Sequence, residues 1–217
     1  MMLPAIALPI DRREILAIVV GASFAAGLNV YATVGTLGLL GHFDLIPLPP
    51  ALHLLTSWWV IGPAAVMFVL EFFADKIPAF DLIWNALHTF VRIPVAALMG
   101  YAASAQLSPK EQLLSALVAA AIAFVAHSGK FAARAAVTPS PEPASNIALS
   151  LGEDAIAIGL TWFATAHPYI AAALVAVAIL LVIVLVRLVW KAMVKLFRGA
   201  RNQLAKWQQP AQHESSA

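Results

Sequence analysis

The apolar positions of the chain gather into six long runs, separated by short polar or proline-containing breaks. An α-helix needs about 20 mainly apolar residues to cross the hydrocarbon core of a bilayer, and each run is close to that length or longer. The pattern therefore predicts an all-α fold, a polytopic membrane helical bundle with six transmembrane helices. The runs cover residues 15–41, 57–75, 80–104, 112–136, 147–165 and 169–188.

The breaks between the runs contain residues that begin and end helices. Proline-rich segments at 47–50 and 138–146 cannot continue a helix, and Pro109 fits the first turn of the fourth one. Ser145 or Asn146 can cap the fifth helix, and Pro168 separates it from the sixth. We divide the chain into an N-terminal cytoplasmic segment (1–14), a six-helix membrane domain (15–198) and a basic, then polar, cytoplasmic tail (199–217).

Polar residues inside the runs recur at the spacing of one helix face. In the third run, Asp81, Asn85, His88 and Arg92 lie at i, i+4, i+7 and i+11. A charged side chain at the bilayer centre costs on the order of 3 kcal/mol, so we expect such faces to point into the bundle. The candidate substrate or ion pathway consists of Asn29, Glu71, Asp75, Asp81, Asn85, His88, Arg92, His127, Lys130, Arg134, Asn146, Glu153 and Asp154.

A purely structural interpretation of these residues is also open. Glu71 or Asp75 could pair with Arg92 or Lys130 only to neutralise each other at a helix end. Buried ion pairs often contribute no more stability than apolar packing does, so pairs that serve only assembly could have been replaced at little cost. The excess of ionisable residues therefore favours function over assembly.

Composition supports the membrane assignment. The chain has 62% hydrophobic and 11% charged residues, whereas about 25% of residues are charged in soluble domains. This excludes a soluble globular protein and a disordered one, and the absence of cysteine excludes a disulfide-stapled domain. The basic residues from Arg187 onward are typical of an anchor at an anionic membrane leaflet, and no nucleic-acid partner is expected.

The distribution of Lys and Arg predicts the side of the membrane on which each loop lies. With the N-terminus inside, Arg12, Arg13, Lys76 and the C-terminal tail share the cytoplasmic side. Lys110 and the proline-rich segment at 47–50 then lie outside. Both termini are therefore expected to be cytoplasmic, and residues 1–14 do not have the pattern of a signal peptide.

The sequence lacks the short motifs of metalloproteases, serine hydrolases and phosphate-binding loops. Ser128 follows His127, but adjacent residues point about 100° apart on a helix, a poor geometry for a nucleophile and its base. His42 and His53 have no nearby cysteine or carboxylate pattern that would complete a metal site. We expect neither enzymatic activity nor a cofactor, and metal binding stays an open question.

The order of the runs also allows an internal repeat. Three helices followed by three more would place the two halves in opposite orientations, as in the 3+3 inverted repeat of many secondary carriers. Residues 26–33 can be laid over 127–134, and residues 70–75 over 149–154.

Several spaced motifs resemble a known family. They are residues 26–33, 71–78, 127–130, 140–143 and 145–146, the series Asp81, Trp84, His88 and Arg92, and the pair Glu153 and Asp154. Over roughly residues 15–167 the chain resembles the domain-of-unknown-function family numbered 4126. The resemblance implies a multi-pass protein of the bacterial inner membrane and brings no settled activity with it. Residues 71–76 are more loosely similar to the Glu-x-Gly-Asp-Lys motif of cation exporters in the lysine-exporter superfamily.

We interpret the chain as a small secondary transporter or exporter that uses intramembrane carboxylates for proton or cation coupling. The expected ion sites are Glu71, Asp75, Glu153 and Asp154, with His88 and Arg92 as their partners. The expected molecular partners are the lipid bilayer and a small solute, an ion or a lipid headgroup, and a homo-oligomer is compatible with the pattern.

Two alternatives remain. Translocation of an anionic lipid or headgroup would use Arg92, Lys130 and Arg134 as a positive site. A non-transporting membrane scaffold would use the polar stripes only for assembly. A water-connected polar cavity favours solute transport, a lateral opening favours lipid movement, and a dry interior with every charge paired favours the scaffold.

Overall fold

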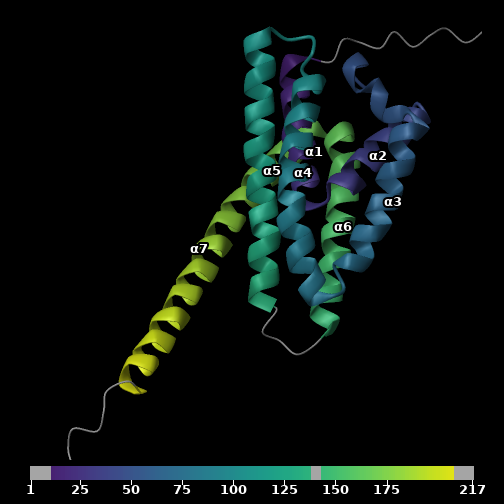
Figure 1. The fold of residues 1–217 in the computed structure, drawn as a ribbon. Coiled ribbons are helices and arrows are strands. Elements are labelled where there is room, and N and C mark those ends of the chain that lie inside the picture. Colours follow the sequence, from purple (N-terminus) through teal and green to yellow (C-terminus); the bar gives the residue numbers. More distant parts are fainter. Residues whose placement is uncertain (1–10, 138–142, 208–217) are drawn as a thin grey trace, which may run out of the picture.

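The computed structural model of the chain describes residues 11–137 and 143–207. Within these ranges every regular element is a helix, which confirms the all-α prediction for this part of the chain (Figure 1). The side chains of a few helix residues, Asp81 and Asn146 among them, lie outside the described set. The elements are α1 (Arg12–Leu28), α2 (Val30–His42), the 3-10 helix η1 (Pro50–Thr56), α3 (Trp58–Ala74), α4 (Pro78–Ala103), α5 (Pro109–Val137), α6 (Pro143–Ala166) and α7 (Pro168–Trp207).

Four helices contain a segment long and apolar enough to cross a membrane. These segments are Ile83–Ala103 in α4, Pro109–Arg134 in α5, Ile147–Ala166 in α6 and Pro168–Gln203 in α7. The pair η1 and α3 forms a further candidate, in which the two helices meet at a bend of 61°. The described residues therefore contain four candidate spans, or five if the bent pair is one span, and six spans are not confirmed. This is the architecture of a multi-pass membrane protein.

The first apolar run, predicted as one span, is two helices that meet at Asn29. The backbone of Asn29 is extended (φ −149°, ψ 104°), so the α-helix cannot continue through it. The Asn29 side-chain oxygen accepts a hydrogen bond from the Ala32 amide at 2.9 Å. This bond satisfies one of the free N–H groups at the start of α2. An asparagine therefore ends one helix and begins the next in the middle of an uncharged run.

Contacts with α6 show that α2 turns back toward the starting end of α1. Gly21 packs closely on the last turn of α6. Further along α1, Asn29 reaches Asp154, nearer the start of α6, and Thr33 then lies beside Thr161. Helix α1 thus runs along α6 from its C-terminal end toward its N-terminal end, and α2 returns in the opposite direction. Residues 12–42 therefore form a helical hairpin with Asn29 at its tip. We call it the α1–α2 hairpin.

The α1–α2 hairpin opens at the end of the bundle where α4 joins α5 and α6 joins α7. Arg12 forms an ion pair with Glu111 in the first turn of α5, with 2.8 Å between Nη1 and Oε1. Glu14 lies beside the junction of α6 and α7. The opposite end holds the turn from α3 to α4, where Asp75 contacts Arg134 near the end of α5.

This geometry corrects the predicted sidedness. The prediction placed Arg12 and Lys110 on opposite sides of the membrane, but Arg12 pairs with the direct neighbour of Lys110. Arg12 and Lys76 instead lie at opposite ends of the bundle, because a hairpin that turns back does not cross it. Helix α7 starts near Glu14 and runs past α5, so its basic C-terminal part lies at the Lys76 end (Figure 1).

The 3+3 repeat is not confirmed. Residues 26–33 contain the break between α1 and α2, whereas the segment laid over them, 127–134, lies within the continuous helix α5. The two segments therefore differ in backbone conformation at the position where the repeat would have to match.

Small residues bring α1 to the centre of the bundle. Ala25 and Ala26 are fully buried, and Gly27 lies so close to the backbone of Ala123 that a Cβ atom at Gly27 would collide with it. Small residues allow helix backbones to approach closely in membranes, where packing rather than hydrophobic burial holds helices together. Helix α1 therefore packs against α4, α5, α6 and α7 and delivers Asn29 to the bundle interior.

Candidate functional site

Buried polar residues from the helices around α1 converge on one interior region. Each is less than one-tenth exposed. They are Glu71 and Asp75 at the end of α3, Asn85 and Arg92 on α4, His127, Lys130 and Arg134 on α5, Glu153 and Asp154 on α6, and Asn29 at the hairpin tip. The helical spacing of these residues aims them at one another, as the polar stripes predicted. We use the term charge network for Glu71, Asp75, Arg92, Lys130, Arg134 and Glu153.

Lys130 lies at the centre of the charge network. Its Nζ atom is 3.0 Å from Asp75 Oδ2, 3.3 Å from Glu71 Oε1 and 3.3 Å from Glu153 Oε2. An ammonium group carries three donors, so it can serve all three carboxylates at once. One buried lysine thus links α5 to both α3 and α6.

Two arginines complete the charge network. Arg134 Nη2 donates hydrogen bonds to Asp75 Oδ2 at 2.9 Å and to Glu153 Oε2 at 2.8 Å. Arg92 Nη2 donates to Glu71 Oε1. Each of the three carboxylates therefore faces two cations, and the three positive charges balance the three negative ones.

His127 extends the charge network toward α4 and is fixed by its hydrogen bonds. Arg92 Nη1 donates to His127 Nδ1 at 2.9 Å, so Nδ1 acts as the acceptor. The Thr89 hydroxyl donates its single proton to the Asn85 carbonyl, which leaves its oxygen to accept from His127 Nε2–H at 2.7 Å. Every ring nitrogen thus has a defined role, and His127 holds the Arg92 guanidinium in place.

Asp154 lies beside the charge network but is not part of it. Its Oδ1 atom accepts a hydrogen bond from Asn29 Nδ2 at 2.9 Å. Its Oδ2 atom is buried and has no hydrogen-bond partner. In the described part of the chain, no lysine or arginine comes within ion-pair distance of Asp154. When ionised, Asp154 therefore has no direct ion-pair partner among these residues and interacts with Lys130 and Lys76 only at longer range.

The contact with Asn29 places Asp154 next to a helix start. Asn29 is the N-cap of α2, and its side chain joins Asp154 to the Ala32 amide in the first turn. The N-terminus of a helix carries a partial positive charge, which favours a nearby carboxylate. A partial charge does not neutralise a full one, so Asp154 keeps most of its negative charge when it is ionised.

Other predicted site residues have different surroundings. His88 is buried but bonds outside the charge network: Nδ1 donates to the Trp84 carbonyl at 2.7 Å, and Nε2 lies 3.0 Å from the Tyr31 hydroxyl. Because Tyr31 belongs to the first turn of α2, His88 contacts the hairpin near its tip rather than a carboxylate. The side chains of Asp81 and Asn146 lie outside the described residues.

The sequence interpretation did not select Tyr31, Thr89 and Thr161 as site residues. Thr89 bonds to His127, and Thr161 lies in α6 with its hydroxyl 3.4 Å from that of Thr33 on the hairpin. A signal was present for Thr161, which follows Asp154 at i+7 and so shares its helix face. Thr89 carried the same signal, because it lies four residues after Asn85 and three before Arg92. Tyr31 had no such signal, because its partner His88 comes from another helix.

Lys76, at the turn from α3 to α4, stays outside the charge network. Its Nζ atom donates to the Phe72 carbonyl at 2.7 Å and lies 3.0 Å from the centre of the Phe72 ring. Burial lowers the pKa of Lys76, while Asp154 and Asp75 oppose this shift. Lys76, which directly follows Asp75 in the sequence, therefore packs on the last turn of α3.

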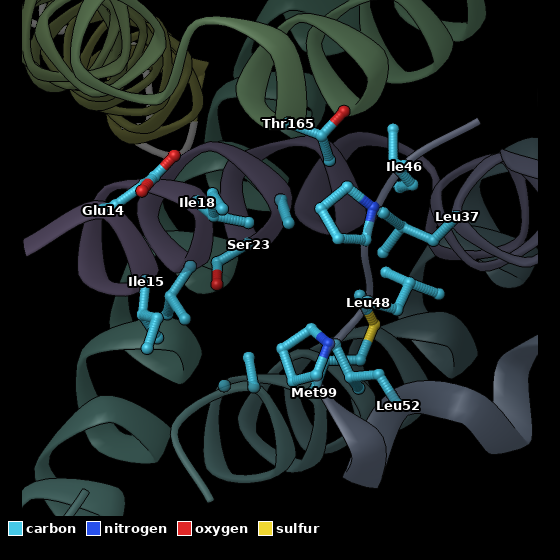
Figure 2. Close-up of a pocket in the computed structure, with 16 residues that line it drawn as sticks. Glu14, Ile15, Ile18, Ser23, Leu37, Ile46, Leu48, Leu52, Met99 and Thr165 are labelled. Atoms are coloured by element: carbon cyan, nitrogen blue, oxygen red, sulfur yellow. The ribbon is translucent and has the colours of Figure 1, made fainter. Parts of the chain in front are cut away.

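The described residues do not form a metal centre. Nowhere in these ranges do three or more His, Asp or Glu side chains form an arrangement suited to a metal ion. A well-formed cleft lies at the open end of the α1–α2 hairpin, away from the charge network (Figure 2).

Apolar helices around a buried charge network, with a broken helix at its edge, define a multi-pass α-helical membrane protein. The domain of unknown function DUF4126 matches residues 16–188, and the chain belongs to this family. This confirms the family identified from the sequence motifs. No curated protein and no solved structure matches the chain. The looser similarity to lysine-exporter cation exporters is not supported.

Proposed function

We propose that the protein is a small secondary transporter in which Asp154 binds the coupling ion, a proton or a monovalent cation. The observation that carries this proposal is a buried carboxylate that accepts a hydrogen bond from Asn29 and has no lysine or arginine within ion-pair distance in the described part of the chain. A buried carboxylate without a direct ion-pair partner is suited to binding a proton or a monovalent cation. The substrate itself is a small solute or ion whose movement is coupled to that charge.

The position of Asp154 supports transport over a purely structural role. Secondary transporters place their ion and substrate sites at discontinuous helices, whose ends and unwound backbone lie inside the membrane region. The break at Asn29 is such a discontinuity, and it contacts Asp154 directly. A scaffold would have every charge paired. Each carboxylate of the charge network forms ion pairs, whereas Asp154 forms none within the part of the chain that the structure describes.

The alternative of anionic headgroup binding receives less support. It would need Arg92, Lys130 and Arg134 to face an incoming phosphate. Each of these residues already contacts a carboxylate in the charge network. A phosphate would have to displace these internal partners, whereas a cation at Asp154 displaces none.

A transport cycle follows from the contact between Asp154 and the hairpin. An amide donates a stronger hydrogen bond to an ionised carboxylate than to a neutral one. Binding of a proton or cation at Asp154 therefore weakens its hold on Asn29 and lets the hairpin tip move. The charge network meanwhile keeps α3, α4, α5 and α6 together as a fixed frame.

We propose that the end carrying Lys76 and the basic part of α7 faces the cytoplasm of the bacterial inner membrane, following the bias of Lys and Arg. Arg13 then lies outside and Gln203 inside. The chain has no cysteine, so single cysteines at these two exposed positions can be labelled with an impermeant thiol reagent in intact cells. We expect labelling at Arg13→Cys and none at Gln203→Cys before lysis. Labelling of Gln203→Cys alone would show that the protein has the opposite orientation in the membrane.

Ion flux through the purified protein tests the proposed function. The full chain is reconstituted in liposomes that contain a pH-sensitive dye, and gradients of sodium, potassium, ammonium and small amines are imposed in turn. We expect at least one gradient to drive proton movement with the wild-type protein. Asp154→Asn should abolish this movement, while Glu111→Gln, the same chemical change in the ion pair at the other end of the bundle, should leave it intact. Equal flux in Asp154→Asn and wild type would contradict the proposal.

A further inference from the structure

The cleft at the open end of the α1–α2 hairpin has apolar walls (Figure 2). It lies between the two arms of the hairpin, the C-terminal end of α4 and the segment that leads into η1. Ile15, Val19, Leu37, Leu52 and Met99 line it, and all five are less than one-tenth exposed. These walls therefore belong to the folded core and not to a loop surface.

A polar side chain without a partner faces the cleft. Ser23 is only 4% exposed, and its hydroxyl points into the space between the walls (Figure 2). Serine hydroxyls in helices commonly bond to the carbonyl four residues earlier. Ser104 and Ser128 do so here, each at 2.8 Å. Ser23 forms no hydrogen bond within the described part of the chain, so its hydroxyl is available to a molecule in the cleft.

A carboxylate marks the other end of the cleft. Glu14 lines it and is partly exposed, and no cation pairs with Glu14 among the residues that the structure describes. The nearby Arg12 is engaged by Glu111 instead. Glu14 and Ser23 are nine residues, or about two and a half turns, apart on α1, so they lie on opposite rims of the helix face that lines the cleft and about 13 Å apart along the axis. The cleft thus has a negative group at one end, apolar walls, and a free hydroxyl about 13 Å away along α1.

We propose that this cleft binds an aliphatic ammonium compound that carries a second polar group at its far end. The ammonium group pairs with Glu14, the hydrocarbon chain lies along the apolar walls, and the second polar group bonds to the Ser23 hydroxyl. A chain of about eight carbon atoms spans the distance between the two groups. The cleft includes neither Asp154 nor Asn29, so this site does not depend on the proposed transport function.

The two polar groups exclude the simplest other occupants. An anionic amphiphile would bring its charge beside the Glu14 carboxylate. A plain hydrocarbon chain would leave the Ser23 hydroxyl buried without a partner, which is unfavourable. Both ends of the ligand therefore contribute to its recognition.

Binding of 8-amino-1-octanol to the purified full chain tests the proposal, with octylamine, 1-octanol and octanoate as comparison probes. Calorimetric titration in a single detergent is run on wild type and on each variant, so that partition into the micelle is the same throughout. We expect 8-amino-1-octanol to bind most tightly, octylamine more weakly, and 1-octanol and octanoate least.

Variants separate the two ends of the ligand. Glu14→Gln should weaken binding of both amines by about tenfold, the effect of losing one charge-assisted contact. Ser23→Ala should weaken binding of 8-amino-1-octanol by about threefold to tenfold and leave binding of octylamine unchanged, because only the amino alcohol reaches the hydroxyl. Glu111→Gln, which alters a neighbouring carboxylate outside this cleft, should change neither amine.

Three results would overturn the proposal. Binding of 1-octanol as tight as that of the amines would show a crevice for lipid chains. Equal binding of 8-amino-1-octanol to wild type and Glu14→Gln would show unspecific partition. If Glu14→Gln does not fold, the Ser23→Ala comparison decides, and equal losses for both amines would contradict the proposed pose.

Discussion

The charge network and the contact between Asp154 and Asn29 lie side by side but are built in opposite ways. In the charge network each carboxylate faces two cations, and Lys130 contacts all three carboxylates. Asp154 accepts a hydrogen bond from the neutral amide of Asn29 and has no lysine or arginine within ion-pair distance among the described residues. Paired charges hold helices together, whereas an unpaired one responds to a proton or cation. This difference supports a structural role for the charge network and the proposed ion-binding role for Asp154.

Adjacent residues on α6 show how the two regions are separated. Glu153 turns to Arg134 and Lys130, and Asp154 turns to Asn29. Neighbours on a helix point about 100° apart, so a single turn of α6 serves both regions. The boundary between the structural and the functional region therefore runs between two consecutive acidic residues.

The largest expected effect comes from removing the central cation of the charge network. Lys130→Met should lower the free energy of unfolding by about 3–5 kcal/mol, because it leaves buried carboxylates without their shared partner. Thermal melts of the purified protein measure this loss. Lys110→Met, the same change at an exposed lysine, should melt like wild type. If Lys130→Met melted at the same temperature as wild type, the charge network would not have the structural role that we assign to it.

A smaller effect is expected at the hairpin tip. Asn29→Ala removes the cap of α2 and the hydrogen bond to Asp154, so the free energy of unfolding should fall by about 2–3 kcal/mol. Asn202→Ala, at an exposed position on α7, provides the matched control. If Asn29→Ala and Asn202→Ala melt alike, the hairpin tip is not held by Asp154.

The smallest effect is expected at Thr161. Its hydroxyl donates to the Ala157 carbonyl at 2.6 Å and lies 3.4 Å from the Thr33 hydroxyl on the hairpin. Thr161→Val keeps the shape of the side chain, and the carbonyl retains its helical hydrogen bond, so we expect a loss of about 0.5–1 kcal/mol in a denaturant titration. A loss as large as that of Asn29→Ala would show that Thr161, rather than Asn29, makes the main contact that holds the hairpin.

Helix positions in the second half of the bundle could be predicted closely from the sequence. Runs expected at 80–104, 112–136 and 147–165 correspond to α4, α5 and α6 within a few residues. Prolines at helix starts and uninterrupted apolar stretches carry this information. The polar stripes also predicted which faces of these helices point inward, because helical spacing alone fixes a common face.

The α1–α2 hairpin could not be predicted in the same way. Hydropathy reports that a segment avoids water, and a hairpin buried in a bundle satisfies this condition as well as a span does. Two signals were present: the run 15–41 exceeds the length that a span requires, and an asparagine, a strong N-cap residue, lies near its middle. The reversal was hidden because it depends on contacts with α6.

Partners within the charge network were predicted only in part. Pairing of Glu71 or Asp75 with Arg92 or Lys130 was one expectation; Glu71 pairs with both cations, and Asp75 pairs with Lys130. Which acid stays unpaired depends on the rotation of α6 about its own axis, which no sequence spacing fixes. Asp154 could therefore be selected as a candidate, but its isolation from the cations could not be foreseen.

The measurement that tests this comparison most directly is the stability of Asp154→Asn, alone and combined with Lys130→Met. The account predicts a change of less than about 1 kcal/mol for Asp154→Asn, because the asparagine oxygen still accepts the bond from Asn29. The double variant should then be as unstable as Lys130→Met alone. Breaking a buried ion pair costs about 3–5 kcal/mol. If Asp154→Asn lowered the free energy of unfolding by that amount and Lys130→Met restored it, the prediction would be contradicted, and Asp154 would belong to the charge network.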